Sequence, residues 1–499
     1  MTRWLLVFAM AAVHLTAGAA TQEEQALLAV LGSGKSAAEK DQACQRLKHI
    51  GTVVAVPALA SLLVDDQLSH SARYALESIP GPEADAAFRD ALARTTGKAK
   101  AGVIDSLGDR RDREAVPLLG GLLGDGEMGE SAARALGKIG GQQAVSALDG
   151  ALPKAAGNVR QAIFDGLLRC AEGLSTHDAQ AARAVYAKLQ ADKTPEHVRM
   201  AAFRGAALAA DDPAGAVVGL LKGSDPAARL VGLQLVGRIE GGAATKAFAG
   251  VLGSVEPAVQ VALLQSLGQR RDTLAAGAIA AIVASESEIV RVAALQALAV
   301  VGDASTVPLL AERAATGKEA EKEAARLALA RLGGEGVREA ILAQLAKAGP
   351  AVQRELADAL GRRQEPEAVP ALLEMAGGTD PASRLAAARS LALLADETMS
   401  AKLVQLVLKA KKEDERTALE KALSASCERS REPQALAGPL ASAANGADVA
   451  ARCTLLRVLA RIGGDTAHEA LRAGVKDADV EVRGASIRAM AEFGGNDVA

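Results

Sequence analysis

A polar position that recurs about every 31 residues is the feature that most constrains how this 499-residue chain can fold. From Arg229 to Arg384 every step is 31 residues, and longer steps before Arg199 and Arg452 accommodate short insertions. We call these positions the polar column, and its arginines include Arg160, Arg199, Arg229, Arg291, Arg384, Arg452 and Arg483. A period of this length predicts a stack of structural repeats rather than one globular core.

Apolar residues follow the polar column at helical spacing. An apolar residue stands seven positions after every member, such as Leu298 after Arg291, and apolar residues dominate three and four positions after it. These spacings lie on one face of an α-helix, so each column member stands near the start of the second helix of a repeat. Acid–proline pairs suit the start of such helices, because the carboxylate can cap the helix and proline fits its first turn. The pairs are Asp225-Pro226, Glu256-Pro257 and Asp380-Pro381.

The first helix of a repeat opens seventeen residues after the polar column, in several repeats with Val-Pro. These pairs are Val56-Pro57, Val116-Pro117, Val307-Pro308 and Val369-Pro370. Glycine pairs mark helix ends that require a left-handed residue, as at Gly140-Gly141, Gly241-Gly242 and Gly463-Gly464. Because no segment has the pattern of a β-strand, the sequence predicts an all-α fold. We expect an α-solenoid, a superhelix of about fifteen two-helix repeats.

The A-V-P-x-L opening of the first helix and the V-R-x-x-A-x-x-A-L-G pattern of the second resemble bacterial HEAT repeats of the phycobilisome-lyase-like type. Residues 290–298 match the second pattern well, and the resemblance covers roughly residues 21 to 495. The resemblance implies that the Val-Pro helix is the outer one and that the arginine-bearing helix lines a concave face. HEAT arrays serve many roles, so it implies a fold and leaves the function open.

The first nineteen residues have the pattern of a secretory signal. Arg3 precedes an apolar run over residues 4–12, and Ala17-Gly18-Ala19 matches a small-x-small cleavage site. We expect residues 1–19 to be removed and residues 20–499 to form an exported HEAT-like solenoid, periplasmic or extracellular. A membrane anchor is the alternative, but neither this run nor any later segment reaches the roughly 20 apolar residues of a spanning helix. No membrane insertion of the mature chain is therefore expected.

Charge, aromatic content and cysteines narrow the possible partners. Lys and Arg number 57 against 60 Asp and Glu, so no overall field favours nucleic acid. Aromatic residues make up 2% of the chain, which disfavours sites that stack sugars or bases. A protein or peptide partner remains. We expect free thiols, because the cysteines lie too far apart to bridge: Cys44, Cys170, Cys427 and Cys453.

Two motifs that suggest chemistry lack the residues that the chemistry needs. Residues 32–36 read Gly-Ser-Gly-Lys-Ser, but Ala29 stands where a phosphate-binding loop requires glycine. Some HEAT proteins that resemble this one are di-iron hydroxylases with paired His-Glu motifs, and this chain has one, His468-Glu469. No two histidines share a helix at ligand spacing. We therefore expect no metal, no other cofactor and no enzyme activity, either as a hydroxylase or as a phycobilin lyase.

Helical angle separates the polar column from a solvent-facing one. The polar column nearly coincides with the apolar positions four and seven residues later, so its side chains should fold over the core and bond to turns of the adjacent repeat. Positions five residues after the polar column lie about 140° away, clear of the core. We call them the outward column. Its candidate ligand-binding members are Gln234, Gln265, Gln296, Arg389, Lys421, Arg457 and Arg488.

The last four of these residues share one sign, which suits an extended acidic partner, although a merely solvated face is the alternative. The sequence thus predicts an exported, non-catalytic scaffold that binds a protein or peptide along its concave face. The alternative is a repeat arm of a larger exported hydrolase or electron-transfer enzyme. Ile487, Met490 and Phe493 have the apolar character of an internal repeat. We therefore expect a truncated last repeat or a docking domain at that end.

Overall fold

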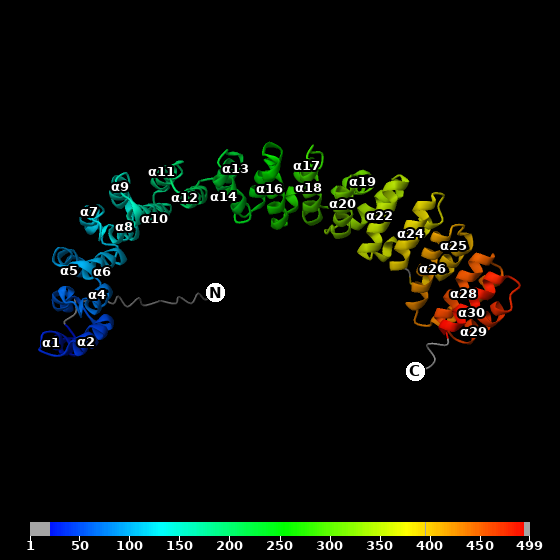
Figure 1. Ribbon diagram of the computed structural model, residues 1–499, viewed down its shortest axis with the longest axis horizontal. Coiled ribbons are helices and arrows are strands. Elements are labelled where there is room, and N and C mark those ends of the chain that lie inside the picture. Colours follow the sequence, from blue (N-terminus) through cyan, green and yellow to red (C-terminus); the bar gives the residue numbers. More distant parts are fainter. Residues whose placement is uncertain (1–19, 395, 494–499) are drawn as a thin grey trace, which may run out of the picture. The chain divides into compact units, whose positions relative to one another are not determined.

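The computed structural model describes residues 20–394 and 396–493. Over these residues the chain forms fifteen helix pairs and no strand, so the predicted all-α solenoid with about fifteen repeats is confirmed. The predicted signal at residues 1–19 lies outside the described residues. Each first helix packs beside the second helix of the same repeat, as for α25 (Ser400–Lys409) and α26 (Glu413–Glu428) in Figure 1.

The chain divides into two compact units, the first reaching Ala216 and including Gly223–Val231, the second comprising Val217–Lys222 and the chain from Gly232 onward. The first unit contains α1 (Gln22–Leu31), α2 (Ala37–Ile50), α3 (Val56–Ser61), α4 (Ser69–Ser78), α5 (Pro82–Arg94), α6 (Gly97–Asp109), α7 (Val116–Gly121), α8 (Gly129–Ile139), α9 (Gly141–Ala151), α10 (Gly157–Leu174), α11 (Ala179–Leu189) and α12 (Glu196–Leu208). Two helices contribute residues to both units, α13 (Pro213–Lys222) and α14 (Pro226–Val236).

The second unit continues with α15 (Gly242–Gly250), α16 (Pro257–Arg270), α17 (Ala276–Ile282), α18 (Glu288–Val301), α19 (Val307–Thr316), α20 (Glu319–Arg331), α21 (Val337–Lys347), α22 (Pro350–Arg363), α23 (Val369–Ala376), α24 (Pro381–Leu394), α25, α26, α27 (Ala437–Asn445), α28 (Val449–Ile462), α29 (Asp465–Val475) and α30 (Val480–Phe493). Short 3-10 turns are η1 (Val53–Ala55), η2 (Leu62–Val64), η3 (Arg113–Ala115), η4 (Leu252–Ser254), η5 (Thr273–Ala275), η6 (Ala304–Thr306), η7 (Pro366–Ala368), η8 (Glu397–Met399) and η9 (Pro433–Leu436).

Helix starts follow the predicted proline signals. The helices α3, α7, α19 and α23 each begin at the valine of a Val-Pro pair. Asp225 accepts a hydrogen bond from the Ala227 amide at 2.8 Å, and Asp380 accepts one from the Ser383 amide at the same distance. Glu256 makes no capping hydrogen bond, contrary to the prediction. Its extra methylene carries the carboxylate away from the first-turn amides that the shorter aspartate reaches.

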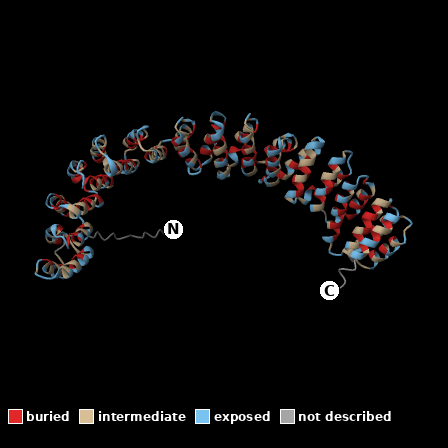
Figure 2. Ribbon diagram, viewed as in Figure 1, coloured by how far each residue is buried: buried red, intermediate tan, exposed pale blue. Residues whose placement is uncertain are grey.

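Within each unit, buried apolar residues lie between the first and second helices of the repeats, and Figure 2 shows the buried positions. The leucines seven positions after the polar column are at most 3% exposed. The backbones of α8 and α10 approach closely, since a Cβ added to Gly137 would lie 2.7 Å from the Gly166 Cα. Any side chain at Gly137 would therefore push these two second helices apart.

In several repeats a side chain of the polar column holds the turn between the two helices. Arg291 Nη1 donates to the carbonyl oxygens of Ser285 and Glu286, at 2.7 and 2.8 Å. These carbonyls lie in the loop after α17, where no helix supplies a donor. Gln260 reaches the Leu252 carbonyl at 2.7 Å with an amide instead of a guanidinium. The arginines that bind carbonyls of their own repeat in the same way are Arg160, Arg229, Arg384, Arg416, Arg452 and Arg483.

The expected bonds to the adjacent repeat take a different form. Turn carbonyls come from the arginine's own repeat, and the following repeat supplies a carboxylate. Glu321 binds Arg291 at 2.7 Å, and Glu415 binds Arg384 at 2.8 Å. The corresponding pairs elsewhere are Arg199–Asp225 and Arg452–Asp477. Helical angle placed these arginines over the core, but it could not tell which turn lay within reach.

A second set of arginines links successive repeats and was missed by the sequence analysis. Arg110 Nη1 donates to the carbonyls of Glu77 and Ile79 at the end of the preceding second helix, at 3.0 and 2.7 Å. Arg270 and Arg363 repeat this arrangement. The residue after each is left-handed, with φ of 55° at Arg111, Arg271 and Gln364. An arginine ten positions after the polar column, followed two residues later by an acid, is the signal that identifies the set.

We expect Arg291→Ala to lower the free energy of unfolding by about 1–3 kcal/mol, because it leaves the buried Glu321 carboxylate and two turn carbonyls without their donor. Chemical denaturation measures the change. Gln296→Ala on the same helix is the matched control, since Gln296 is exposed. Equal denaturation midpoints for the two variants would contradict the role assigned to Arg291.

All four cysteines are buried free thiols. Burial raises the pKa of the Cys44 thiol to about 11 and that of Cys170 to about 12. Because a thiol reacts as its thiolate, we expect no labelling of the folded protein by a disulfide reagent at pH 8, and four thiols labelled after unfolding. Rapid labelling of any thiol in the folded protein would show that its helix is not packed as described.

Candidate functional site

The outward column lies on the surface formed by the second helices. Gln234, Gln265 and Gln296 are exposed on α14, α16 and α18. Arg389, Lys421 and Arg488 are exposed on α24, α26 and α30, whereas Arg457 on α28 is partly buried. The angle argument thus places these side chains correctly in every case but Arg457.

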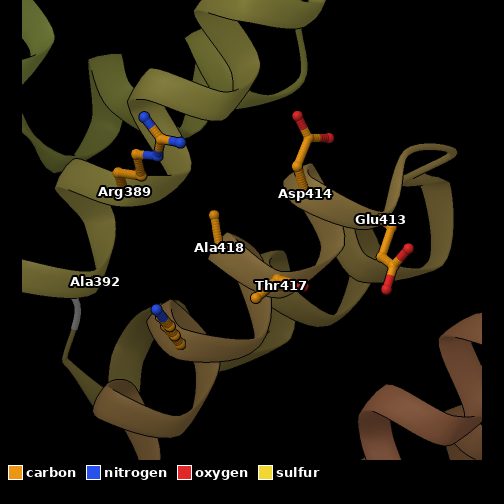
Figure 3. A pocket seen from close by; sticks show the side chains of 7 residues that line it. Arg389, Ala392, Glu413, Asp414, Thr417 and Ala418 are labelled. Atoms are coloured by element: carbon orange, nitrogen blue, oxygen red, sulfur yellow. The ribbon is translucent and has the colours of Figure 1, made fainter.

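A hollow of about 500 Å³ lies beside Arg389 and Lys421. Its other walls are formed by Glu413 and Asp414 from the first turn of α26, and Thr417 and Ala418 lie between the two sides. Figure 3 shows Arg389 and Asp414 on opposite sides of Ala418. The hollow therefore has a cationic side and an anionic side, separated by small residues.

A second hollow, of about 650 Å³, adjoins the first along the stack. Glu413 and Thr417 line both hollows, so the two are continuous over α26. Glu481 and Arg488 from α30 line its far part, and Ala450, Gly484 and Ala485 contribute small side chains or none. We call the surface over both hollows, from α24 to α30, the C-terminal face.

Arg457 is already neutralised by an ion pair. Its Nη2 lies 2.6 Å and its Nε 3.0 Å from Glu420 Oε2, on the preceding second helix. This hydrogen bond raises the pKa of Arg457. Glu420 is 8% exposed, and Arg461 also approaches it at 3.8 Å. Arg457 therefore joins two repeats and contributes little free charge to the surface.

Arg389, Lys421 and Arg488 form no ion pair within 4.0 Å among the residues that the structure describes. They face three carboxylates on the same surface, those of Glu413, Asp414 and Glu481. Two further arginines line this surface but are occupied, Arg416 by the Ala410 carbonyl and Arg457 by Glu420. Its exposed charges are therefore of both signs, whereas the sequence predicted a stripe of one sign. The prediction considered only the positions five residues after the polar column. It overlooked the acidic residues two turns earlier on the same side of α26 and α30.

Sequence spacing could have identified these carboxylates. Asp414 precedes Lys421 by seven residues, and Glu481 precedes Arg488 by seven. Seven residues are two helical turns, so each pair shares a face and lies about 10 Å apart along the axis. An acid seven positions before a basic member of the outward column is therefore the signal.

Other sequence expectations concern metals, membranes and the last helix. Among the described residues, no group of three or more His, Cys, Asp or Glu side chains is placed to hold a metal ion. Over the same residues, no helix combines the length and apolar character that crossing a membrane requires. Ile487 is 56% exposed on α30, and the side chain of Phe493 lies outside the part of the chain that is described.

Comparison with known proteins identifies HEAT repeats at residues 86–168 and 338–424. No curated protein matches the chain. Among solved structures, an AP-3 complex homology model covers 95% of this chain and 93% of its own, at 13% identity and a TM-score of 0.36. A crystal structure of importin beta aligns with 95% of this chain and 76% of its own, at 12% identity and a TM-score of 0.36.

Human deoxyhypusine hydroxylase covers 56% of this chain and 95% of its own, at 20% identity and a TM-score of 0.22. Because these TM-scores are low, no functional argument rests on the three likenesses. The helix pairs and the two matched segments together show that the chain is an all-α solenoid with HEAT repeats.

Proposed function

We propose that the protein is an exported, non-catalytic scaffold that binds a protein partner on its C-terminal face. The observation that carries this proposal is a contrast between two sets of cations. Arginines of the polar column are bonded to turn carbonyls, whereas Arg389 and Lys421 stand exposed beside a continuous hollow. Exposed charges without an ion-pair partner can attract a partner protein, and the small residues between them leave space for its side chains.

Stacked second helices favour a protein partner over other classes. They present an elongated surface, which repeat proteins use to hold extended segments of other proteins. Three exposed carboxylates on the C-terminal face disfavour a nucleic acid, whose phosphates they would repel. Apart from Tyr74, which is exposed in the first unit, aromatic side chains for stacking bases are scarce in the chain.

Export rests on the signal-like segment at residues 1–19. Expression in a secreting host should yield a mature chain that begins at Ala20, because Ala17-Gly18-Ala19 supplies the small residues that a signal peptidase requires. Intact-mass measurement of the exported protein checks this result. A chain that keeps its N-terminal segment and stays inside the cell would contradict export, while leaving the binding proposal intact.

Charge reversal tests the binding face. We expect Arg389→Glu, Lys421→Glu and Arg488→Glu together to weaken binding of the natural partner at least about tenfold, because attraction at three positions becomes repulsion. Binding of the parent protein should also weaken as salt rises, since exposed charges are screened over about 8–10 Å. Isothermal titration with the purified partner measures both effects.

The matched control reverses three exposed cations on first helices: Lys402→Glu, Lys409→Glu and Arg472→Glu. It changes the net charge equally but leaves the C-terminal face intact, so the partner's affinity should stay within about twofold. Melting curves of both variants check that the repeats remain folded. Unchanged affinity in the C-terminal variant, or an equal loss in both variants, would contradict the proposed face.

A further inference from the structure

The exposed charges of the C-terminal face are sorted into two rows, whereas the partly buried Arg416, which also lines it, donates to the Ala410 carbonyl. Arg389, Lys421 and Arg488 form the cation row, and Glu413, Asp414 and Glu481 form the acid row. On α26 and α30 the acid stands in or near the first turn and the cation two turns later. Both rows therefore run along the stack of repeats, with the acid row toward the N-terminal ends of these two helices.

The distance between the rows selects the kind of segment that can touch both. Seven residues of helix place the rows about 10 Å apart. An α-helix with its side chains is about 10–12 Å wide, so one helix can bridge both rows along its length. An extended strand presents a single line of side chains to a surface, because alternate residues point away. A strand would therefore satisfy one row and leave the other without a partner.

The floor between the rows admits a helix. Thr417, Ala418, Ala450 and Ala485 line it, and Gly484 adds no side chain. Adjacent packed helices lie about 8–10 Å apart, and residues seven apart on a bound helix are separated by a similar distance. The acid row has members on α26 and α30 with α28 between them, so basic side chains about fourteen residues apart on one flank can meet both.

We propose that the C-terminal face binds an α-helix of a partner protein that has one acidic and one basic flank. The acidic side chains lie over the cation row, and the basic side chains lie over the acid row. Small apolar residues of that helix face the floor. This inference rests on the proposed function and makes the partner's chemistry specific. A purely acidic segment gains at the cation row and loses at the acid row, because like charges repel.

Synthetic helices test the inference with the full mature chain. Four labelled 21-residue peptides are compared by fluorescence anisotropy at low salt, with helicity equalised by a staple on the solvent face. The sorted peptide carries Glu on one flank, Lys on the other and Ala toward the floor. The mixed peptide has the same composition with both charges on each flank, and the acidic peptide has Glu on both flanks. The fourth peptide has the sorted sequence with a central proline and no staple, so that it cannot form a continuous helix.

We expect the sorted peptide to bind at least about fivefold more tightly than each of the other three, because only it forms favourable ion pairs with both rows. Neutralising the acid row with Glu413→Gln, Asp414→Asn and Glu481→Gln should remove its advantage over the acidic peptide. The control variant Glu374→Gln, Asp465→Asn and Glu469→Gln changes exposed acids on first helices and should preserve the order.

If the acidic peptide binds the parent protein most tightly, the partner helix does not need a basic flank. That result would overturn this inference while supporting a cationic binding face. Equal binding of the sorted and mixed peptides would overturn the sorting of charge, and equal binding of the proline peptide would overturn the helix. If no peptide binds although the natural partner does, this inference fails and the proposed function stands. If substitutions in neither the cation row nor the acid row alter binding of the natural partner, both this inference and the proposed function are contradicted.

Discussion

The hydrogen bond from the start of a second helix to the carbonyls of the turn before it is the interaction on which these repeats depend. Backbone carbonyls in the turn between two helices have no donor inside a helix. Arg291, Arg384 and Arg483 supply guanidinium groups, and Gln260 supplies an amide at the equivalent position. Because donor and acceptor belong to one repeat, these repeats close their own turns, and a carboxylate such as Glu321 then links a repeat to its neighbour.

This use of the polar column determines which charges remain for binding. Side chains of the column lie over the core and are occupied by backbone oxygens, so they cannot also serve a partner. Charges further around the same helices, such as Lys421 and Asp414, face solvent over shallow hollows. Arg457 belongs to the outward column, but it forms an ion pair with Glu420 of the preceding repeat and therefore serves to join two repeats. On α26, Arg416 of the polar column and the exposed Asp414 and Lys421 thus have separate environments, and the proposed recognition uses the exposed pair.

Period and helical angle predicted the architecture because every repeat carries the same short signals, such as Val-Pro and an apolar residue seven positions after Arg291. They did not predict which residues pair between repeats. The pairing of Arg457 with Glu420 spans an irregular step, from position 416 to position 452 of the polar column, where the period gives no register. The acid row was missed because one column was followed at one angle, although Asp414 and Lys421 share a face.

Site-specific photo-cross-linking tests the central claim that partners bind the second-helix side of the C-terminal repeats. A photoreactive amino acid at Thr417 lies between the two charged rows, whereas one at Lys402 lies on the first helix α25. Illumination of cells that produce each protein, followed by mass spectrometry, shows which side contacts another protein. The account predicts one covalent adduct from position 417 and none of that adduct from position 402. An adduct from position 402 without one from position 417 would contradict it.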